Sequence, residues 1–325
     1  MRAAFYTSQG PAREVLKVGE LPTPQPGPGE VRVHLSVSGA NPSDWKARKG
    51  GYRPMPADLV IPHSDGAGVI DAIGPGVSPA RLGERVWTWN GQWKRAFGTA
   101  AEYITLPSAQ AVQLPEAVDF EVGACLGIPV FTALQAIRTA DPKPGETILI
   151  AGGAGSVGHY AIQLAKRRGA QVLTTVSSDA KAAHALAAGA DAVINYRTED
   201  VGERVRALVP EGVDAVVEMD LTRNVSYYPR ILKPHATCAV YGMSANESTL
   251  PSLALMANNT RLIFLFIYEL TAADRAAGLA EINQLLEAGA LTHTIARRMP
   301  LADIAEAHEL IEEGKVTGNI VLEIG

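Results

Sequence analysis

The feature that most constrains the fold is a glycine-rich segment at residues 151–158, AGGAGSVG, almost halfway along the chain of 325 residues. The apolar run TILIAG leads into it and the amphipathic pattern SVGHYAIQLAKRRG leads out of it, which predicts a strand, a tight loop and a helix that starts near Ser156. The pattern G-x-G-x-x-G is met by Gly153, Ala154, Gly155, Ser156, Val157 and Gly158. Between a strand and a helix, its glycines allow a tight turn, close approach of the backbone to a pyrophosphate, and packing of helix on strand. We therefore expect a dinucleotide-binding loop, the alternative being a plain glycine-rich turn without a ligand.

Apolar runs alternate with helical patterns after this loop. The runs are QVLTTV, DAVINY, VDAVVEM, ATCAVYG and TRLIFLF. Near-continuous apolar strands between helices are typical of a parallel sheet that is covered on both faces. We predict an α/β fold with a doubly wound parallel (Rossmann) nucleotide-binding domain over residues 125–264.

Residues 1–124 have a different pattern. Proline and glycine are dense in segments such as LPTPQPGPGEVRV, and VRVHLSVSG alternates apolar and polar residues with a period of two. This pattern is typical of half-buried strands, so we predict a mainly antiparallel, barrel-like domain. The tail at 265–325 ends in the strand pattern KVTGNIVLEIG, which needs a sheet to join. We expect it to return to the first domain, so that residues 125–264 are inserted between 1–124 and 265–325.

Charge and composition argue against several kinds of partner. A formal net charge of −5 does not suit a nucleic-acid surface, which favours a basic stripe. The start MRAAFYTSQG lacks the apolar core of a signal peptide, and the run LIFLFIYEL is too short to span a bilayer. Cys125 and Cys238 have unrelated surroundings, and we interpret both as buried free thiols. We therefore expect a cytoplasmic protein without a membrane partner.

The end of the second predicted strand of the nucleotide domain, TTVSS, distinguishes NADP from NAD. An NAD-binding domain places an acidic residue there to hold the ribose 2′-hydroxyl. Ser177 instead leaves room for a 2′-phosphate, Lys181 offers a positive charge, and Tyr196 ends the neighbouring strand. The alternative for Lys181 is a solvated helix lysine, and the discordant Asp179 is interpreted as a helix cap. We expect NADPH as the cofactor.

A family resemblance extends over the whole chain. Its segments, in order, are GANPSDWKAR, IPHSDGAGVIDAIGPGV, GIPVFTAL, AGGAGSVG, GADAVINYR and GKVTGNIVLEI. With these segments the chain resembles the medium-chain dehydrogenase/reductase superfamily, in its zinc-free quinone oxidoreductase (zeta-crystallin-like) branch. The resemblance implies a GroES-like catalytic domain that is split around the Rossmann domain, which would explain why the glycine loop comes so late. It also implies a homodimer, in which the apolar strand TRLIFLF is a candidate for pairing between subunits.

Zinc enzymes of this superfamily hold their catalytic metal with a cysteine, a histidine and a second cysteine or acid. In this chain the corresponding places hold Asn41, Ser64 and, with less definite alignment, Ile128. None of these is a good zinc ligand, and His63, one residue away from the histidine place, would lack thiolate partners. We therefore expect no metal. Without a metal or an evident acid–base pair, hydride delivery to an activated acceptor is favoured over the oxidation of an alcohol.

The same resemblance supplies candidate site residues in the first domain. Asn41 and Tyr52 match positions that face the nicotinamide and the substrate, where Asn41 would bond an amide or acceptor oxygen and Tyr52 would donate to a developing oxyanion. The alternatives are a turn cap for Asn41 and a loop aromatic for Tyr52. Asp44 and Asp65 are expected to order the loop rather than to transfer protons. The tryptophans Trp45, Trp87, Trp89 and Trp93 form either an aromatic wall for a flat acceptor or ordinary packing.

Further residues are expected, by resemblance, to line the cofactor. Thr132 matches a threonine beside the nicotinamide ring. Lys315 is expected to approach the adenosine end, although Asn319 replaces the usual lysine there. The remaining candidates follow the fifth and sixth strands of the domain: Gly242, Met243, Ser244, Phe264, Leu265 and Phe266.

Three functions remain open at this level. The first is an NADPH-dependent quinone reductase that works by direct hydride transfer without metal or flavin. The second is an NADPH-dependent enone or alkenal double-bond reductase, which shares nearly every motif. The third is a nucleotide-dependent RNA-binding or structural protein with low turnover, against which the acidic net charge and the intact loop argue.

Overall fold

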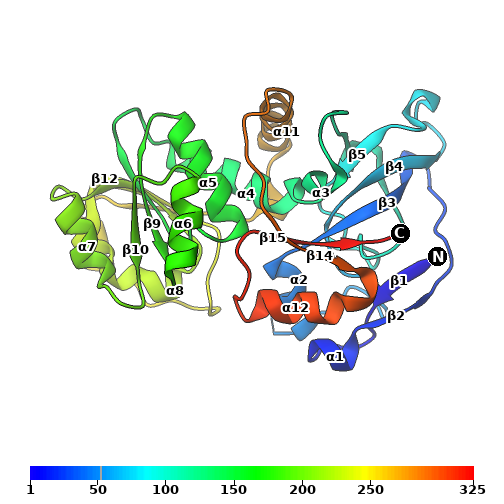
Figure 1. Cartoon of the computed structure of the whole chain (residues 1–325), viewed down its shortest axis with the longest axis horizontal. Coiled ribbons are helices and arrows are strands. Elements are labelled where there is room, and N and C mark those ends of the chain that lie inside the picture. The colour runs from blue at the N-terminus through cyan, green and yellow to red at the C-terminus, as the bar shows by residue number, and fades with distance from the viewer. Residues whose placement is uncertain (52) are drawn as a thin grey trace. The chain divides into compact units, whose positions relative to one another are not determined.

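The computed structural model describes residues 1–51 and 53–325. By its internal packing the chain divides into two compact units, one formed by Met1–Pro129 with Ile282–Gly325 and the other by Val130–Glu281 (Figure 1). The domain bounds expected from the sequence, 1–124 with 265–325 and 125–264, stay a prediction. No helix in either described stretch has both the length and the hydropathy that a membrane span requires.

A parallel sheet forms the second unit. Its strand order is β10-β9-β8-β11-β12-β13, and every pairing between neighbours is parallel. In this order the chain proceeds outward in one direction from β8 and in the other from β11, so the predicted doubly wound sheet is confirmed. The strands are β8 (Thr147–Ile150), β9 (Gln171–Val176), β10 (Ala192–Asn195), β11 (Val213–Glu218), β12 (Leu232–Val240) and β13 (Arg261–Phe264).

Helices separate these strands along the chain, and α5 and α6 pack on β8, β9 and β10 (Figure 1). Strand β8 has the sequence TILI with every residue buried, as expected of a central parallel strand that is covered on both faces. The helices are α4 (Phe131–Ala140), α5 (Ser156–Arg167), α6 (Asp179–Ala187), α7 (Val201–Leu208), α8 (Leu221–Asn224), α9 (Tyr228–Ile231), α10 (Ser252–Ala257) and α11 (Ala272–Glu287), the last of which ends in the first unit.

The first unit is built on a mainly antiparallel sheet. Its order is β14-β15-β3-β4-β5-β7, with β6 also paired to β3, while β1 and β2 form a separate antiparallel pair. Strands are β1 (Arg2–Phe5), β2 (Lys17–Glu20), β3 (Glu30–Ala40), β4 (Asp65–Ile73), β5 (Arg85–Thr88), β6 (Tyr103–Pro107), β7 (Ala111–Gln113), β14 (Ile295–Pro300) and β15 (Asn319–Glu323). Helices are α1 (Ala12–Val15), α2 (Pro42–Lys49), α3 (Phe120–Gly123) and α12 (Ile304–Glu312).

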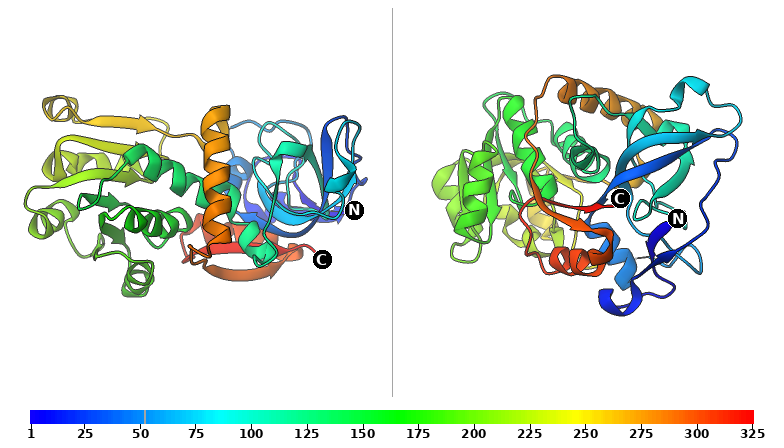
Figure 2. Two further views of the ribbon diagram at one scale, coloured as in Figure 1. Left: turned by 90° about the horizontal axis from the view of Figure 1, so that it is seen from above. Right: turned by 45° about the vertical axis from the view of Figure 1, so that its right-hand side comes forward.

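The last strand completes this sheet. Strand β15 runs antiparallel to β3, with Ile320 opposite Ala40 and Glu323 opposite Val37. Figure 2 shows this red segment among the blue and cyan strands from the start of the chain. The predicted return of the C-terminal strand to the first domain is therefore confirmed. The predicted period of two in β3 is also met, since Val31, Val33 and Leu35 are buried in the core.

Candidate active site

The glycine loop follows β8, at the carboxyl edge of the parallel sheet where the strand order reverses. Open α/β sheets bind their ligands at this edge. The loop is held against β9, because Gly152 N donates to Thr175 Oγ1 at 3.0 Å and Gly153 N to the Thr175 carbonyl at 3.1 Å. A Cβ on Gly153 would lie 2.2 Å from Thr174 Oγ1, and one on Gly158 would lie 2.3 Å from the Gly152 carbonyl oxygen. Both positions therefore require glycine for steric reasons.

Helix α5 begins directly after the loop, with Gly155 as its N-cap residue. Glycine provides no side-chain cap, and the first turn of α5 contains no acidic residue. The amide groups and the positive dipole end of α5 thus meet no protein carboxylate from this turn. The residues from Gly153 to Gly158 fit a pyrophosphate, which would bind through the backbone of this turn.

The residues expected near a ribose 2′-phosphate lie together at the end of β9. Tyr196 N donates to the carbonyl of Val176 at 3.1 Å, which places Tyr196 beside the start of the Ser177–Ser178 turn. Ser178 is the N-cap residue of α6, and its hydroxyl accepts from Lys181 N. The interpretation of Asp179 as the cap is wrong, since Asp179 is the first residue of the helix itself and its charge suits the dipole there.

The residues that follow β11 and β12 form the next part of the carboxyl edge of this sheet. A Cβ on Gly242 would lie 2.2 Å from the Met219 carbonyl oxygen, and one on Gly152 would lie 2.2 Å from Met219 Sδ. Met219 therefore packs between the glycine loop and the segment of Gly242, Met243 and Ser244, although no sequence pattern pointed to it. Ser244 N donates to Asp220 Oδ1 at 3.0 Å, which holds the segment in place.

The other cofactor candidates lie in different environments. Phe264 and Phe266 are 58 % and 43 % exposed, and Leu265 N between them donates to the Val240 carbonyl at 2.8 Å. Thr132 on α4 is buried, and its Oγ1 has no hydrogen-bond partner among the described residues. In the first unit, Lys315 forms an ion pair with Glu313 at 2.6 Å. Asn319, at the place of a family lysine, is buried and donates to the Thr294 carbonyl at 3.2 Å.

In the first unit, Asn41 and Asp65 form a buried polar pair. Asn41 is the N-cap residue of α2, which agrees with its alternative interpretation as a turn cap. Its backbone N donates to Asp44 Oδ2 at 2.7 Å. Its Nδ2 donates to Asp65 Oδ2 at 2.9 Å, and the same oxygen accepts from Ile128 N at 2.9 Å. Two of the three places that hold zinc in other members thus converge on one carboxylate oxygen. Tyr52 lies outside the described residues.

Burial changes the protonation of both carboxyls. It raises the pKa of Asp44 to about 7, against the hydrogen bond from Asn41 N and the charge of Arg53, which lower it. It raises the pKa of Asp65 well above its usual range, and the neighbouring Asp44 raises it further. Both causes act by disfavouring the charged form. Burial and the neighbouring Asp44 thus both favour the uncharged form of Asp65 beside the Asn41 amide.

A chain of buried hydrogen bonds continues from Asp65, and sequence reasoning missed it. Thr99 Oγ1 donates to the Asp65 carbonyl at 2.6 Å, Ser38 Oγ lies 2.8 Å from Thr99 Oγ1, and His63 Nδ1 lies 2.9 Å from Ser38 Oγ. His63 Nε2 lies 2.9 Å from His308 Nε2. Since a carbonyl only accepts, the direction of the whole chain follows: Ser38 donates to Thr99, His63 Nδ1–H to Ser38, and His308 Nε2–H to His63.

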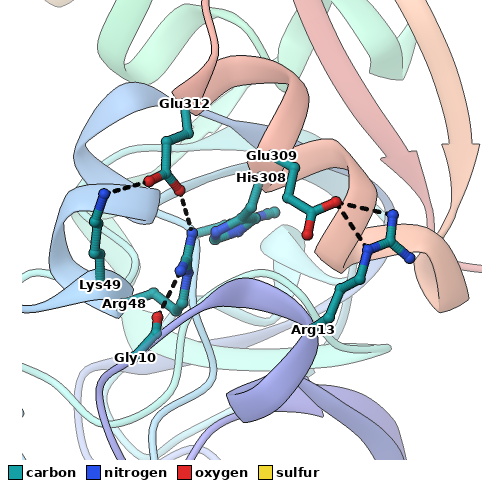
Figure 3. Close-up of polar contacts among 8 residues, drawn as sticks. Gly10, Arg13, Arg48, Lys49, His308, Glu309 and Glu312 are labelled. Atoms are coloured by element: carbon teal, nitrogen blue, oxygen red, sulfur yellow. Dashed lines mark hydrogen bonds and ion pairs between the residues drawn. The ribbon is translucent and has the colours of Figure 1, made fainter.

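His308 is placed by contacts between α12 and α2 (Figure 3). Arg48 is fully buried, and it donates to the Gly10 carbonyl at 2.6 Å and to Glu312 Oε2 at 2.9 Å. Lys49 Nζ donates to Glu312 Oε1 at 2.6 Å. His63 has a φ of 74°, a conformation that non-glycine residues rarely adopt, so its two hydrogen bonds hold a strained backbone. The only sequence signal was a histidine inside an apolar segment.

The side chains present do not suggest a metal centre. Within residues 1–51 and 53–325, no three His, Cys, Asp or Glu side chains are grouped so as to hold a metal ion. His63 Nδ1 and Nε2 are both used in the hydrogen-bond chain. Cys125 and Cys238 are buried free thiols, as predicted.

Comparison with known proteins agrees with both units. Residues 27–116 match the alcohol dehydrogenase GroES-like domain, and residues 156–284 match a family described as zinc-binding dehydrogenase. Human quinone oxidoreductase is 32% identical over 313 residues, covering 95% of this chain and 94% of that protein. A solved NAD-dependent alcohol dehydrogenase is 31% identical, with a TM-score of 0.91 and 100% of both chains covered. A mycobacterial protein solved in complex with NADPH is 30% identical, with a TM-score of 0.87, covering 99% of this chain and 100% of that one.

The glycine loop at the reversal of the strand order, the split first unit and the similarity to human quinone oxidoreductase over nearly the whole chain lead to one assignment. The chain belongs to the quinone oxidoreductase family of the medium-chain dehydrogenase/reductase superfamily, and it is an oxidoreductase.

Proposed function

We propose that the protein is an NADPH-dependent quinone reductase that acts by direct hydride transfer, without metal or flavin. The observation that carries the proposal is the Asn41–Asp65 pair at 2.9 Å, because an amide and a buried carboxyl occupy the region where zinc members place metal ligands. Such groups orient an acceptor by hydrogen bonds but do not activate an alcohol as a metal does. The human relative at 32% identity and the NADPH-bound relative at 30% identity support the acceptor and the cofactor.

The residues of the chain would divide the work as follows. The loop from Gly153 to Gly158 would bind the pyrophosphate and Thr132 would contact the nicotinamide end, while bound NADPH supplies the hydride. Asn41 would hold the acceptor oxygen with its amide, whose orientation Asp65 maintains. Tyr52 would donate to the developing oxyanion, and the proton would come from water or a nearby hydroxyl. A quinone accepts charge well, so this arrangement demands little more than positioning.

Initial rates of NADPH oxidation would test this function. The acceptors are benzoquinone, phenanthrenequinone and an alkyl enone, each assayed with NADPH and with NADH after subtraction of the non-enzymatic rate. We expect fast reduction of both quinones and a preference for NADPH. Reduction of the enone alone would replace quinone reduction by double-bond reduction. If all three acceptors remain unreduced while NADPH binds, the protein is not a quinone reductase, and a mobility-shift assay with single-stranded RNA would follow.

Replacing Lys181 with alanine should weaken NADPH much more than NADH. A charge-assisted hydrogen bond to the 2′-phosphate contributes about 1–3 kcal/mol, and NADH has no such phosphate. The measurement is the dissociation constant of each cofactor, from the fluorescence of the reduced nicotinamide. Lys166→Ala is the matched control, because Lys166 also lies on a helix of this unit, where it pairs with Asp191 at 2.8 Å. Equal weakening of both cofactors by Lys181→Ala would show that Lys181 does not bind the phosphate.

We also propose that the protein is a cytoplasmic homodimer. Strand β13 is the last strand of its sheet, and Ile263 and Phe264 are 38 % and 58 % exposed. An apolar edge strand of this kind favours pairing with another strand. The buried free thiols of Cys125 and Cys238 support a reducing compartment. Sedimentation equilibrium should give twice the chain mass of 34.3 kDa, and a mass of one chain would refute the dimer.

A further inference from the structure

Arg53 and Trp93 form a cation–aromatic pair in the first unit. The Arg53 guanidinium carbon lies 5.1 Å from the centroid of the Trp93 ring, and Arg53 Nη2 donates to Gln92 Oε1. Gln92 is buried, and its Nε2 donates to the Arg95 carbonyl at 2.9 Å, so its oxygen is turned toward Arg53. The guanidinium is therefore held in one orientation by a ring and an amide.

Two independent observations relate the pair of Arg53 and Trp93 to Asn41. The charge of Arg53 lowers the pKa of Asp44, whose carboxylate accepts from Asn41 N. The loop that carries Trp93 is held where Gly91 N donates to the Ser64 carbonyl at 3.0 Å. Ser64 precedes Asp65, which accepts from Asn41 Nδ2. Arg53 thus acts on one of the two carboxyls that bond Asn41, and the segment before Trp93 is bonded to the residue before the other.

The Arg53 guanidinium has donors beyond the one that its amide partner uses. In the part of the chain that the structure describes, Arg53 makes no ion pair with a carboxylate. Burial raises the pKa of the nearby Asp44 to about 7 and that of Asp65 well above its usual range, so burial disfavours the charged form of both carboxyls. A guanidinium has five N–H donors and keeps its charge in proteins, so donors beyond the one on Gln92 remain for an anion.

We propose that Arg53 and Trp93 recognise planar acceptors that carry an acidic group, such as a sulfonate or a carboxylate. The inference rests on the proposed quinone reduction and names the class of acceptor for that same site. The Trp93 ring offers an aromatic surface for the acceptor ring. Arg53, which lies over this ring together with Lys94 at 5.5 Å, binds the anionic substituent. Because Gln92 and Trp93 already orient the guanidinium, little side-chain entropy is lost when the anion binds.

The test compares 1,4-naphthoquinone with its 2-sulfonate at saturating NADPH. We expect Arg53→Gln to lower kcat/KM about tenfold for the sulfonate, mainly through KM, and less than about twofold for the uncharged quinone. Arg53→Lys retains the charge and should recover much of the loss. Arg32→Gln is the matched control, since the Arg32 guanidinium also lies 5.1 Å from an aromatic centroid, that of Tyr103. Arg32 lies near the start of β3, whereas Asn41 directly follows the end of this strand. This control should leave kcat/KM unchanged for both quinones.

Equal losses for the two quinones would make Arg53 a structural residue and overturn the inference, as would an unchanged rate with the sulfonate. A second measurement separates this inference from the proposed function. Calorimetric titration of the NADP⁺ complex with naphthalene-2-sulfonate, which cannot be reduced, tests recognition without turnover. Weaker binding to Arg53→Gln would support the recognition site even if no quinone is reduced. Absence of binding to the unaltered protein, or equal binding to both proteins, would refute it.

Discussion

Gly158→Val is expected to abolish measurable NADPH binding and to destabilise the second unit. A Cβ at this position would lie 2.3 Å from the Gly152 carbonyl oxygen and 2.8 Å from Gly153 Cα. Both are backbone atoms, so a change of side-chain rotamer cannot relieve the clash. The glycine loop must therefore move away from α5. Overpacking of this kind lowers the free energy of unfolding by about 1–3 kcal/mol. Because the displaced amides also lose their bonds to the pyrophosphate, we expect at least a 100-fold loss of NADPH affinity, about 2.7 kcal/mol. Fluorescence titration with NADPH measures it.

Gly155→Ala is the companion variant for this experiment. A Cβ on Gly155 would lie 3.4 Å from the Gly152 carbonyl oxygen, which is ordinary contact, and Gly155 has an extended backbone that alanine adopts. We expect thermal unfolding of this variant to match that of the unaltered protein, while NADPH binds more weakly because the methyl group occupies space needed by the pyrophosphate. If Gly155→Ala bound NADPH normally, the loop would not approach a pyrophosphate in the way proposed.

His308→Gln is expected to make the protein markedly more resistant to acid. Burial lowers the pKa of His63 to about 3 and lowers that of His308 well below its ordinary value, with His63 and Arg48 adding to the effect on His308. Both rings therefore stay neutral in the folded protein, while in the unfolded chain they take up protons below about pH 6.5. Their contribution to stability is complete above that pH and is lost as the pH falls toward 3, by up to about 1.4 kcal/mol per pH unit for each histidine.

The carboxyls in the same unit have the opposite effect. The pKa of Asp44 is raised to about 7 and that of Asp65 is raised well above its usual range, so stability falls as the pH rises from about 4 through the folded pKa values. The total pH profile thus mixes two opposed slopes, and only a difference between variants isolates the histidines. Glutamine retains an N–H donor for His63 Nε2 but does not titrate, so the rest of the hydrogen-bond chain is kept.

Urea unfolding at pH 7.5, 6.0 and 4.5 supplies the comparison. Near pH 7.5 the two proteins should have similar free energies of unfolding, and by pH 4.5 the variant should gain about 2–3 kcal/mol over the unaltered protein. Glu312 faces Arg48 and Lys49 in both proteins, so its contribution cancels (Figure 3). Parallel profiles for the two proteins would mean that His308 takes up its proton without unfolding, and the account of the pair would be wrong.

Much of the nucleotide-binding unit follows from local sequence. The glycine loop, the start of α5 at Ser156 and the strand ends that carry Ser177 and Tyr196 come from short patterns whose geometry a few neighbouring residues determine. The capping role assigned to Asp179 was wrong by one residue, since Ser178 and Asp179 both suit a helix start and local pattern does not separate them. Met219 escaped notice because its packing against Gly152 joins the ends of different strands.

Local sequence patterns are enough to predict the order of the two units, the doubly wound sheet and the need for glycine in the loop after β8. Each of these depends on periodicity or on steric limits within a single turn, and such limits act over a few residues. The packing of distant segments, in contrast, brings Asn41 and Ile128 to one oxygen of Asp65. It also joins Ser38, Thr99, His63 and His308 in one chain of hydrogen bonds. His63 and His308 are 245 residues apart, and no local pattern relates them. Burial keeps both rings neutral, and the hydrogen bond from Thr99 to the Asp65 carbonyl sets the direction of the chain. Both conditions exist only once the strands and α12 have packed.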